Sequence, residues 1–275
     1  MSDKQKKGLK RNTIDKYYTK DTSVKICLEL IKQHLTINDN DLIIEPSAGN
    51  GSFIESIKIV SKNHLFYDLE PENDEIEKQD YLECDTSVIR EKYENIHIVG
   101  NPPFGRQSSL AIKFIKKSCE FCDSVSFILP KSFKKESLKK TFPLQFHIII
   151  EMDMPDKSFL VDCNEHDVPC VFQIWKKMDH NRIVCEKLEP SGFIFVEKTE
   201  DPDISFRRVG VNAGKIDMNV IDKSCQSHYF IKFTNSKPVT DNINNLLKIQ
   251  YSFNNTVGPK SISKQELIKE FIKVL

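Results

Sequence analysis

The strongest candidate for chemistry in this sequence is a stiff tetrapeptide, Asn101-Pro102-Pro103-Phe104, which follows directly after the apolar run 96–99. The two prolines fix φ at about −65°, and Pro102 biases Asn101 toward an extended backbone. We expect the Asn101 side-chain carbonyl and the Pro102 backbone carbonyl to converge on one point outside a sheet. Two acceptors at one point suit an aromatic amine, because accepting from both N–H bonds frees the nitrogen lone pair for attack. Phe104 offers a flat apolar surface for the ring that bears the amine.

A second candidate site is the stretch DLIIEPSAGNGSF at 41–53, in which Glu45 ends an apolar run and Gly49 and Gly51 precede a helix-like segment. Glycines let the backbone come close to a ligand, and a helix N-terminus favours an anionic group. This is the layout of a nucleotide-type site at the edge of a doubly wound sheet. Because the spacing is not GxGxxG, a dinucleotide is disfavoured.

Acidic residues follow two further runs. Asp68, with Glu70 as the near alternative, ends the run 65–67 and is placed to accept hydrogen bonds from ribose hydroxyls. Asp80 precedes a turn and could accept from the exocyclic amine of an adenine, with Tyr81 or Leu82 against the face of the ring. Acids at successive strand ends favour one shared ligand site.

The elements that must position these residues alternate along the chain. Short apolar runs at 42–44, 64–67, 96–99, 125–129, 146–150 and 168–175 predict strands, and helix-like segments lie at 22–35, 52–60, 108–121 and 132–141. This alternation predicts an α/β protein with a mostly parallel, doubly wound sheet. Segment 146–176 has little helical pattern, so we expect the sheet to end in an antiparallel pair.

The chain divides by pattern into three parts. Residues 1–20 form a basic arm with seven Lys or Arg, residues 21–180 form the main domain, and residues 185–275 form a small β-rich unit. In the last part, Ser263 and Glu266 stand in capping-box spacing before a closing helix. No internal repeat is visible.

Charge and apolar content limit the class of protein. The 40 basic and 40 acidic residues cancel, so net charge gives no argument for a polyanionic partner, although their segregation could create one basic face. No apolar run is long enough for a membrane span, and no signal peptide is visible, so we expect a soluble, intracellular protein, cytoplasmic or nuclear.

The eight cysteines are scattered, which favours reduced core thiols. Cys119 and Cys122 form a CxxC that Cys163, His166 and Cys170 could complete to a zinc site on paper. The helical spacing around Cys119 gives a simpler explanation, and we expect no metal.

Several motifs resemble those of one enzyme family. EPSAGNGSF, followed about 50 residues later by NPPFG, looks like motifs I and IV of the S-adenosylmethionine-dependent amino-methyltransferases that modify adenine N6 in nucleic acid. KYYTKDTSVKICLELI resembles their motif X region, with Lys20 in place of the usual proline of Tyr-Thr-Pro. FILPKSF and VPCVFQIWKK are similar to later strands. The match covers residues 14–176, and its linear order is similar to the gamma group, with a look similar to versions from large DNA viruses and phages.

The resemblance implies a Rossmann-like class I methyltransferase fold and assigns roles to named positions. It implies an amine-activating and base-stacking site at Asn101, Pro102, Pro103 and Phe104. It implies that S-adenosylmethionine is held by Glu45, Gly49, Gly51, Asp68, Asp80 and Tyr81, with Thr19 near its carboxylate. No metal is required, and the target base must be flipped out or single-stranded.

The implied partner is nucleic acid, DNA rather than RNA, with a partner subunit able to supply sequence specificity. Basic residues expected to contact it are Lys131, Lys134, Lys135, Arg207 and Arg208. Two alternatives stay open. One keeps methyl transfer but changes the substrate to RNA adenine or guanine N2, or to a protein glutamine. The other is an inactive, nucleic-acid-binding subunit.

Overall fold

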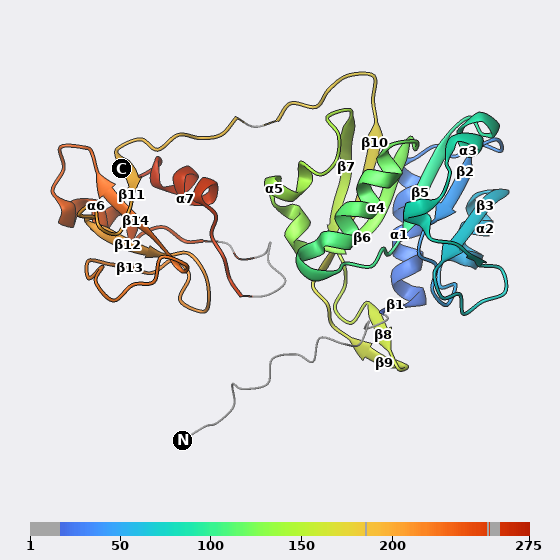
Figure 1. The fold of residues 1–275 in the computed structure, drawn as a ribbon, viewed down its shortest axis with the longest axis horizontal. Helices are drawn as coiled ribbons and strands as arrows, with labels where there is room; N and C mark the ends of the chain where they lie inside the picture. Colours follow the sequence, from blue (N-terminus) through green and yellow to red (C-terminus); the bar gives the residue numbers. More distant parts are fainter. Residues whose placement is uncertain (1–16, 185, 252, 254–258) are drawn as a thin grey trace. The chain divides into compact units, whose positions relative to one another are not determined.

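The computed structural model describes residues 17–184, 186–251, 253 and 259–275. It divides the chain into two compact units, Met1–Arg182 and Ile183–Leu275 (Figure 1). The expected basic arm at 1–20 lies outside the described residues, except for 17–20.

A seven-stranded sheet forms the centre of the first unit, in the order β4-β3-β2-β5-β6-β10-β7. Its strands are β2 (Leu42–Glu45), β3 (Asn63–Asp68), β4 (Glu77–Lys78), β5 (Ile96–Gly100), β6 (Ser124–Pro130), β7 (Phe146–Asp153) and β10 (Cys170–Lys177). Neighbours from β4 to β6 pair in parallel, while β10 runs antiparallel to both β6 and β7. The structure therefore confirms the predicted Rossmann-like, mostly parallel sheet with an antiparallel end.

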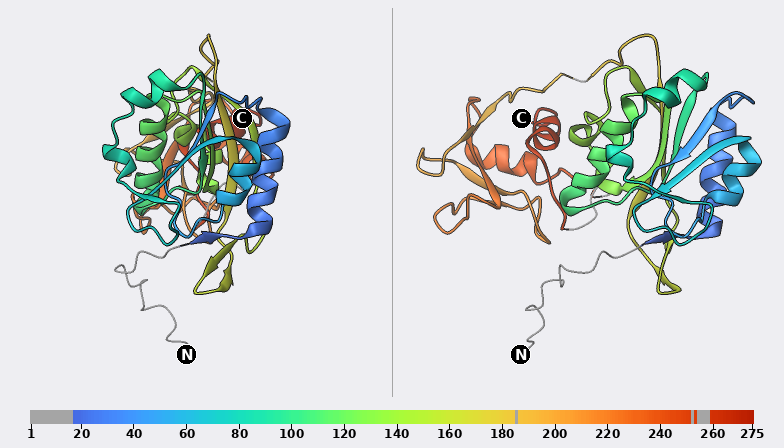
Figure 2. Two further views of the ribbon diagram at one scale, coloured as in Figure 1. Left: turned by 90° about the vertical axis from the view of Figure 1, so that its right-hand side faces the viewer. Right: turned by 45° about the vertical axis from the view of Figure 1, so that its right-hand side comes forward.

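Helices cover both faces of this sheet (Figure 2). On one face lie α1 (Asp21–His34) and α2 (Ile54–Val60), and on the other lie α3 (Ser87–Lys92), α4 (Ser109–Cys119) and α5 (Glu136–Lys139). Strand side chains alternate between the two cores: Leu42 and Ile44 pack with α4, whereas Ile43 packs with α1. Burial on both faces explains why the central strand β2 is apolar up to Glu45 rather than alternating.

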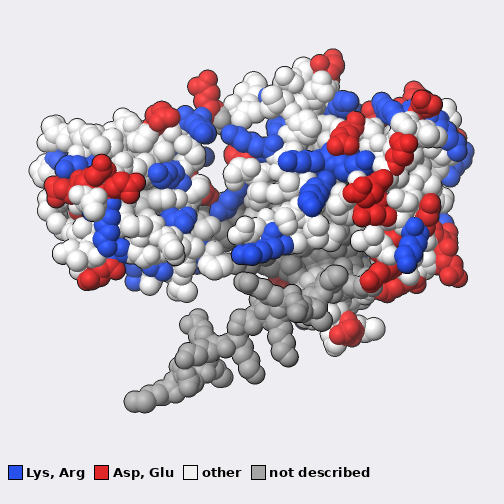
Figure 3. Space-filling view, in the orientation of Figure 1, with Lys and Arg blue, Asp and Glu red and all other residues white. Residues whose placement is uncertain are grey.

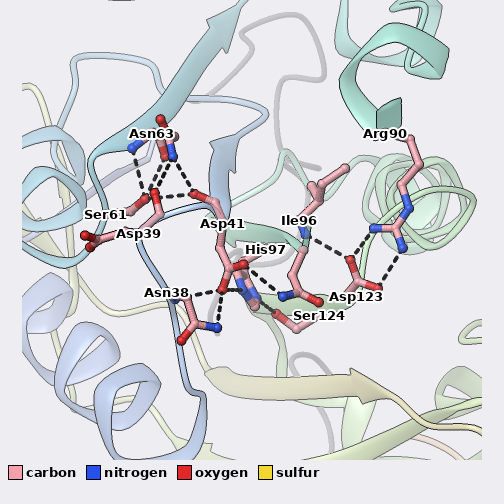
Figure 4. Close-up of polar contacts among 11 residues, drawn as sticks. Asn38, Asp39, Asp41, Ser61, Asn63, Arg90, Ile96, His97, Asp123 and Ser124 are labelled. Carbon is pink, nitrogen blue, oxygen red and sulfur yellow. Dashed lines mark hydrogen bonds and ion pairs between the residues drawn. The ribbon is translucent and has the colours of Figure 1, made fainter. Parts of the chain in front are cut away.

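A buried polar network joins the starts of β2, β5 and β6 (Figure 4). Asp41, which is fully buried, accepts from Asn95 Nδ2 at 2.8 Å, and its Oδ2 lies 3.5 Å from His97 Nε2. His97 Nδ1 lies 2.8 Å from Ser124 Oγ. Because parallel strands share their direction, this network lies at the edge of the sheet opposite the carboxyl ends of the strands. The network links three strands at their amino ends, whereas the candidate site lies at their carboxyl ends.

A small antiparallel sheet lies at the other edge, in the order β1-β8-β9. It consists of β1 (Tyr18–Thr19), β8 (Phe159–Val161) and β9 (Asn164–His166). β8 and β9 form a hairpin inside the connection between β7 and β10, and Thr19 of β1 pairs with Phe159. The chain entering the first unit is thereby fixed to a hairpin about 140 residues later in the sequence.

The second unit is built on an antiparallel sheet in the order β11-β14-β12-β13. Its strands are β11 (Phe193–Val196), β12 (Ile204–Arg207), β13 (Ile216–Asp217) and β14 (His228–Phe233). Helices α6 (Val239–Leu246) and α7 (Lys264–Phe271) pack on it around Phe193, Phe206 and Phe271. α7 begins with the predicted capping box: Ser263 Oγ accepts from Glu266 N, and the Glu266 carboxylate accepts from Ser263 N.

Among the described residues, no helix has the length and apolar character needed to span a bilayer. Cys119 and Cys122 are buried in the core under α4. Within the described part of the chain, no cluster of three or more His, Cys, Asp or Glu side chains is arranged to hold a metal ion.

Candidate active site

The turn after β2 is a backbone loop that folds back onto the end of β3. Gly49 and Gly51 have φ of +55° and +87°, a region that favours glycine. Gly49 N donates to Asp68 Oδ2 at 2.8 Å, and Ala48 N donates to the Tyr67 carbonyl at 2.8 Å. A Cβ on Gly51 would lie 2.7 Å from Ile54 Cδ1. At its two glycines the loop therefore consists of main chain alone, where the sequence predicts close approach of a ligand.

Glu45, the last residue of β2, is an unusual buried acid. It is 2% exposed, and its Oε2 has no hydrogen-bond partner. Burial, and then the negative charge of Asp68, raise the pKa of this carboxyl well above its usual value. Gly100 lies against it, since a Cβ there would be 3.2 Å from Glu45 Cγ. A buried acceptor without a partner is costly and is often explained by a ligand.

Asp68 and Asp80 lie at the positions that the sequence predicts, but both already contact the backbone. Asp68 Oδ1 accepts from Glu70 N at 2.9 Å and its Oδ2 from Gly49 N, and each oxygen keeps a second lone pair. Asp80 caps the 3₁₀ turn Tyr81–Glu83, since its Oδ1 accepts from Leu82 N at 2.9 Å. The two carboxylates thus hold the loops in place with acceptor capacity to spare.

Tyr81 has a structural role. It is 2% exposed, its hydroxyl lies 2.8 Å from Ser118 Oγ, and its ring stacks on Phe114 of α4 with the centroids 5.5 Å apart. In this structure the ring is therefore part of the hydrophobic core. Of the two residues proposed to face an adenine, the half-buried Leu82 is the better placed.

The Asn101–Phe104 segment leaves the carboxyl end of β5 next to Glu45. Asn101 Nδ2 donates to the Tyr17 carbonyl at 3.3 Å, which fixes the direction of the amide. The other side-chain atom, Oδ1, is buried and has no hydrogen-bond partner. Pro102 is buried and Pro103 exposed. The structure thus brings the orphaned oxygens of Glu45 and Asn101 to the ends of neighbouring strands.

Phe104 is half-buried and packs against both cores of the first unit. After it, the chain adopts three left-handed conformations before α4 begins, at Gly105 (φ +68°), Gln107 (φ +53°) and Ser108 (φ +62°). Two of these are not glycine, and strain of this kind is concentrated at functional sites. The Phe104 carbonyl accepts from Leu110 N at 3.1 Å, which ties the segment to α4.

The N-terminal strand completes this edge of the sheet. Tyr17 supplies the carbonyl that holds Asn101, and a Cβ on Gly49 would lie 3.3 Å from the Tyr18 ring. Thr19 is 5% exposed. The sequence pattern predicts only Thr19 at this site, although Tyr17 and Tyr18 stand next to it in KYYTK. Their role depends on contacts between segments more than 80 residues apart, which the sequence does not show.

Lys20, which stands where the resembled motif has proline, makes bonds that a proline cannot make. Its backbone N–H donates to the Ser158 carbonyl at 3.0 Å, and its Nζ lies 2.5 Å from Glu165 Oε1. Its φ of −63° is nonetheless the value that proline would impose. The substitution keeps the path of the backbone and adds two ties to the β8–β9 hairpin.

The basic residues expected to contact nucleic acid are all engaged within their own unit. Lys131 and Lys134 both pair with Asp153, at 3.1 and 2.6 Å. Lys135 donates its backbone N–H to the Ser132 carbonyl and has further interactions. On the face displayed in Figure 3, Lys and Arg gather over α4, bordered by acidic residues.

The two arginines of the second unit differ from each other. Arg208 donates from Nε and Nη2 to the Gln226 carbonyl and lies over the Tyr229 ring, 5.6 Å from its centroid. Arg207 donates from Nε to the Val209 carbonyl at 2.8 Å and from Nη1 to Ser227 Oγ at 3.1 Å. Its Nη2 has no partner among the described residues. Arg207 therefore keeps donor capacity for a ligand.

No family model matches the sequence, and no curated protein matches it. Solved structures do. A candidate RNA methyltransferase from Pyrococcus horikoshii matches at 15% identity and a TM-score of 0.46, over 62% of this chain and 92% of that one. A candidate class I S-adenosylmethionine-dependent methyltransferase from Listeria monocytogenes matches at 13% and 0.44, over 62% and 64%. A candidate hemolysin from Streptococcus thermophilus matches at 13% and 0.43, over 60% and 68%. These TM-scores and identities are too low to assign a function, so the function has to be inferred from the residues of this chain.

Proposed function

We propose that this protein transfers a methyl group from S-adenosylmethionine to the N6 amine of adenine in DNA. The observation that supports this most is Asn101 Oδ1, a buried acceptor without a partner at the carboxyl end of β5, followed by the half-buried Phe104. In open α/β sheets, ligands bind outside the carboxyl ends of the strands, where the order reverses. The order reverses between β2 and β5, because β3 follows β2 on one side and β5 pairs with β2 on the other side.

The residues at this edge fit the cofactor. Main chain at Gly49 and Gly51 suits close approach of the amino-acid part, and the second lone pairs of Asp68 suit the ribose hydroxyls. Asp80 and the half-buried Leu82 suit the adenine, while the orphaned Glu45 Oε2 suits a donor such as an ammonium group. When bound, S-adenosylmethionine supplies an electrophilic methyl group on a sulfonium.

The chain's own contribution to the reaction is to hold and activate the amine. Asn101 Oδ1 and the Pro102 carbonyl accept from the two N–H bonds of the target amine, which withdraws the nitrogen lone pair from conjugation with the ring. Phe104 supports the flipped-out base from one side. Transfer of the methyl group from sulfur to nitrogen would leave the cofactor as the neutral thioether S-adenosylhomocysteine and would release one amine proton to water. Positioning and the exclusion of water account for the rate in this scheme.

The test is methyl transfer from labelled S-adenosylmethionine to duplex DNA, single-stranded DNA and RNA, with mass spectrometry of the product nucleosides. The proposal expects N6-methyldeoxyadenosine. N6-methyladenosine or N2-methylguanosine in RNA alone, or methylated glutamine in a protein substrate, would keep the chemistry and change the substrate. If calorimetry shows no binding of S-adenosylmethionine, the proposal fails and an inactive nucleic-acid-binding subunit takes its place.

A further inference from the structure

The second unit contains a cavity of about 430 Å³ that the proposed active site does not use. It lies between β12, β13 and the loop that leads to β14, and polar and charged side chains form most of its wall. Its volume is in the range of small-ligand sites. Every residue of the wall belongs to the second unit and is described.

The charges around this cavity favour an anion. Arg207, Lys215 and Lys223 face Asp217 and Asp222, and Lys223 Nζ is already paired with Asp217 Oδ2. With that pair neutralised, the remaining charges on the wall are the two positive charges of Arg207 and Lys215 and the negative charge of the exposed Asp222. Lys215 has no ion-pair partner in the described part of the chain, and Arg207 keeps its Nη2 group. Two cations with unused donors on one cavity wall form the usual chemistry of a phosphate site.

His228 lies on the same wall. Its pKa lies below the usual value for histidine, chiefly because of burial; the hydrogen bond to the Ser224 carbonyl raises the pKa, and the charges of Arg207 and Lys223 lower it by smaller amounts. Its Nδ1 lies 3.1 Å from the Ser224 carbonyl. A neutral imidazole at neutral pH leaves the arginine and lysines as the charges that an anion would meet.

Exposed aliphatic side chains flank the cavity in sequence. Val211, Met218 and Ile221 are 91%, 60% and 78% exposed, and each is the immediate neighbour of a residue in the cavity wall. Gly210 and Gly214, both with φ of +96°, shape the turn that presents Val211. Apolar groups beside an anion site suit a ligand that joins a phosphate to an apolar ring.

We propose that this cavity binds a phosphate of a nucleic-acid chain, with the adjacent aliphatic side chains against unpaired bases. Arg207 and Lys215 are the phosphate ligands, and Val211, Met218 and Ile221 are the base contacts. Proteins that bind nucleic acid combine such phosphate contacts with apolar side chains placed against bases or between them. The inference rests on the proposed function only in taking nucleic acid as the substrate, and it assigns a separate binding role to the second unit.

The test uses the full chain and a short single-stranded DNA labelled with fluorescein, with binding followed by anisotropy over a series of salt concentrations. Lys215→Ala is expected to weaken binding several-fold at low salt and to reduce the salt slope by about one. Since Lys215 is exposed and makes no ion pair within the described residues, its loss leaves the fold intact. The matched control is Lys269→Ala on α7, an exposed lysine outside the cavity, which is expected to keep the wild-type slope.

Competition experiments distinguish a nucleic-acid phosphate from free phosphate and from other polyanions as the ligand of this cavity. Inorganic phosphate should displace the DNA only at far higher concentration, because it lacks bases. The proposal is overturned if the full chain does not bind DNA, if both lysine variants change the slope equally, or if polyglutamate binds as tightly as DNA with the same dependence on Lys215.

Failure here is distinguishable from failure of the proposed function. Lys215→Ala should lose DNA affinity while keeping the wild-type affinity for S-adenosylmethionine. Asn101→Ala should lose transfer and keep DNA affinity.

Discussion

Replacing Glu45 by Gln should stabilise the protein at neutral pH, which is unusual for a change in a fully buried residue. The wild-type carboxyl is 2% exposed with an unpartnered oxygen, and burial followed by repulsion from Asp68 raises its pKa. In the unfolded chain the same group titrates at about 4.3. A raised folded-state pKa means that the stabilising contribution is complete below about pH 4 and is lost as the pH rises toward the folded-state pKa.

The magnitude follows from linkage. Each pH unit above about 4.3 costs the wild type about 1.4 kcal/mol, for as long as the pH stays below the folded-state pKa. For a unit of this size, 1 kcal/mol corresponds to about 2–4 °C in Tm. We therefore expect the Tm advantage of Glu45→Gln to grow by about 3–6 °C for each pH unit over that range.

The assay is unfolding followed by calorimetry or circular dichroism from pH 4 to pH 8, with Glu91→Gln, an exposed acid on α3, as the matched control. The difference between Glu45→Gln and wild type should vanish near pH 4 and grow as the pH rises, while the control stays flat. A difference independent of pH would refute the reasoning, because it would mean that the Glu45 carboxyl ionises normally in the folded protein. The same variant should bind S-adenosylmethionine more weakly, since Gln cannot supply a carboxylate.

Two further substitutions distinguish residues that bind the cofactor from residues that only stabilise the fold. Gly51→Ala should lower stability by about 1–2 kcal/mol, because L side chains rarely adopt its φ of +87°. It should also weaken cofactor binding in calorimetry, because a strained turn cannot keep the same backbone path; unchanged affinity would remove the loop from the site. Tyr81→Phe should cost about 1 kcal/mol in denaturant unfolding, through loss of the 2.8 Å bond to Ser118, with transfer rate and cofactor affinity kept; a selective loss of affinity would return Tyr81 to the site.

Local pattern was sufficient to predict most of the first unit. Apolar runs bounded by turns correspond to β2, β3, β5, β6, β7 and β10, because strands in a sheet covered by helices on both faces are rich in apolar residues. The helices at 21–34, 54–60 and 109–119 follow their apolar spacing closely. The segment 132–141 is less regular than expected, a 3₁₀ turn followed by the short α5. In the second unit, α6 and β13 were not anticipated.

Contacts between distant segments could not be read from the sequence. Asn101 and Tyr17 meet across 84 positions, and β1 pairs with a hairpin whose short strands carry no strong periodicity. The same limit explains Tyr81: its position after Asp80 suggested a ligand wall, but only packing shows that its ring lies under α4. The ion pairs of Lys131 and Lys134 with Asp153, a strand residue about 20 positions away, are also contacts of this kind.

The most direct test of the central claim is the single-turnover rate of methyl transfer by Asn101→Ala at saturating S-adenosylmethionine and DNA, with cofactor affinity measured in the same samples. Asn101 Oδ1 is the buried acceptor that the proposed mechanism gives to the amine. The expected result is a rate about 10²–10³ lower than wild type, typical of losing one positioned hydrogen-bonding group, with cofactor affinity unchanged within error. A variant that transfers methyl at the wild-type rate would contradict the account.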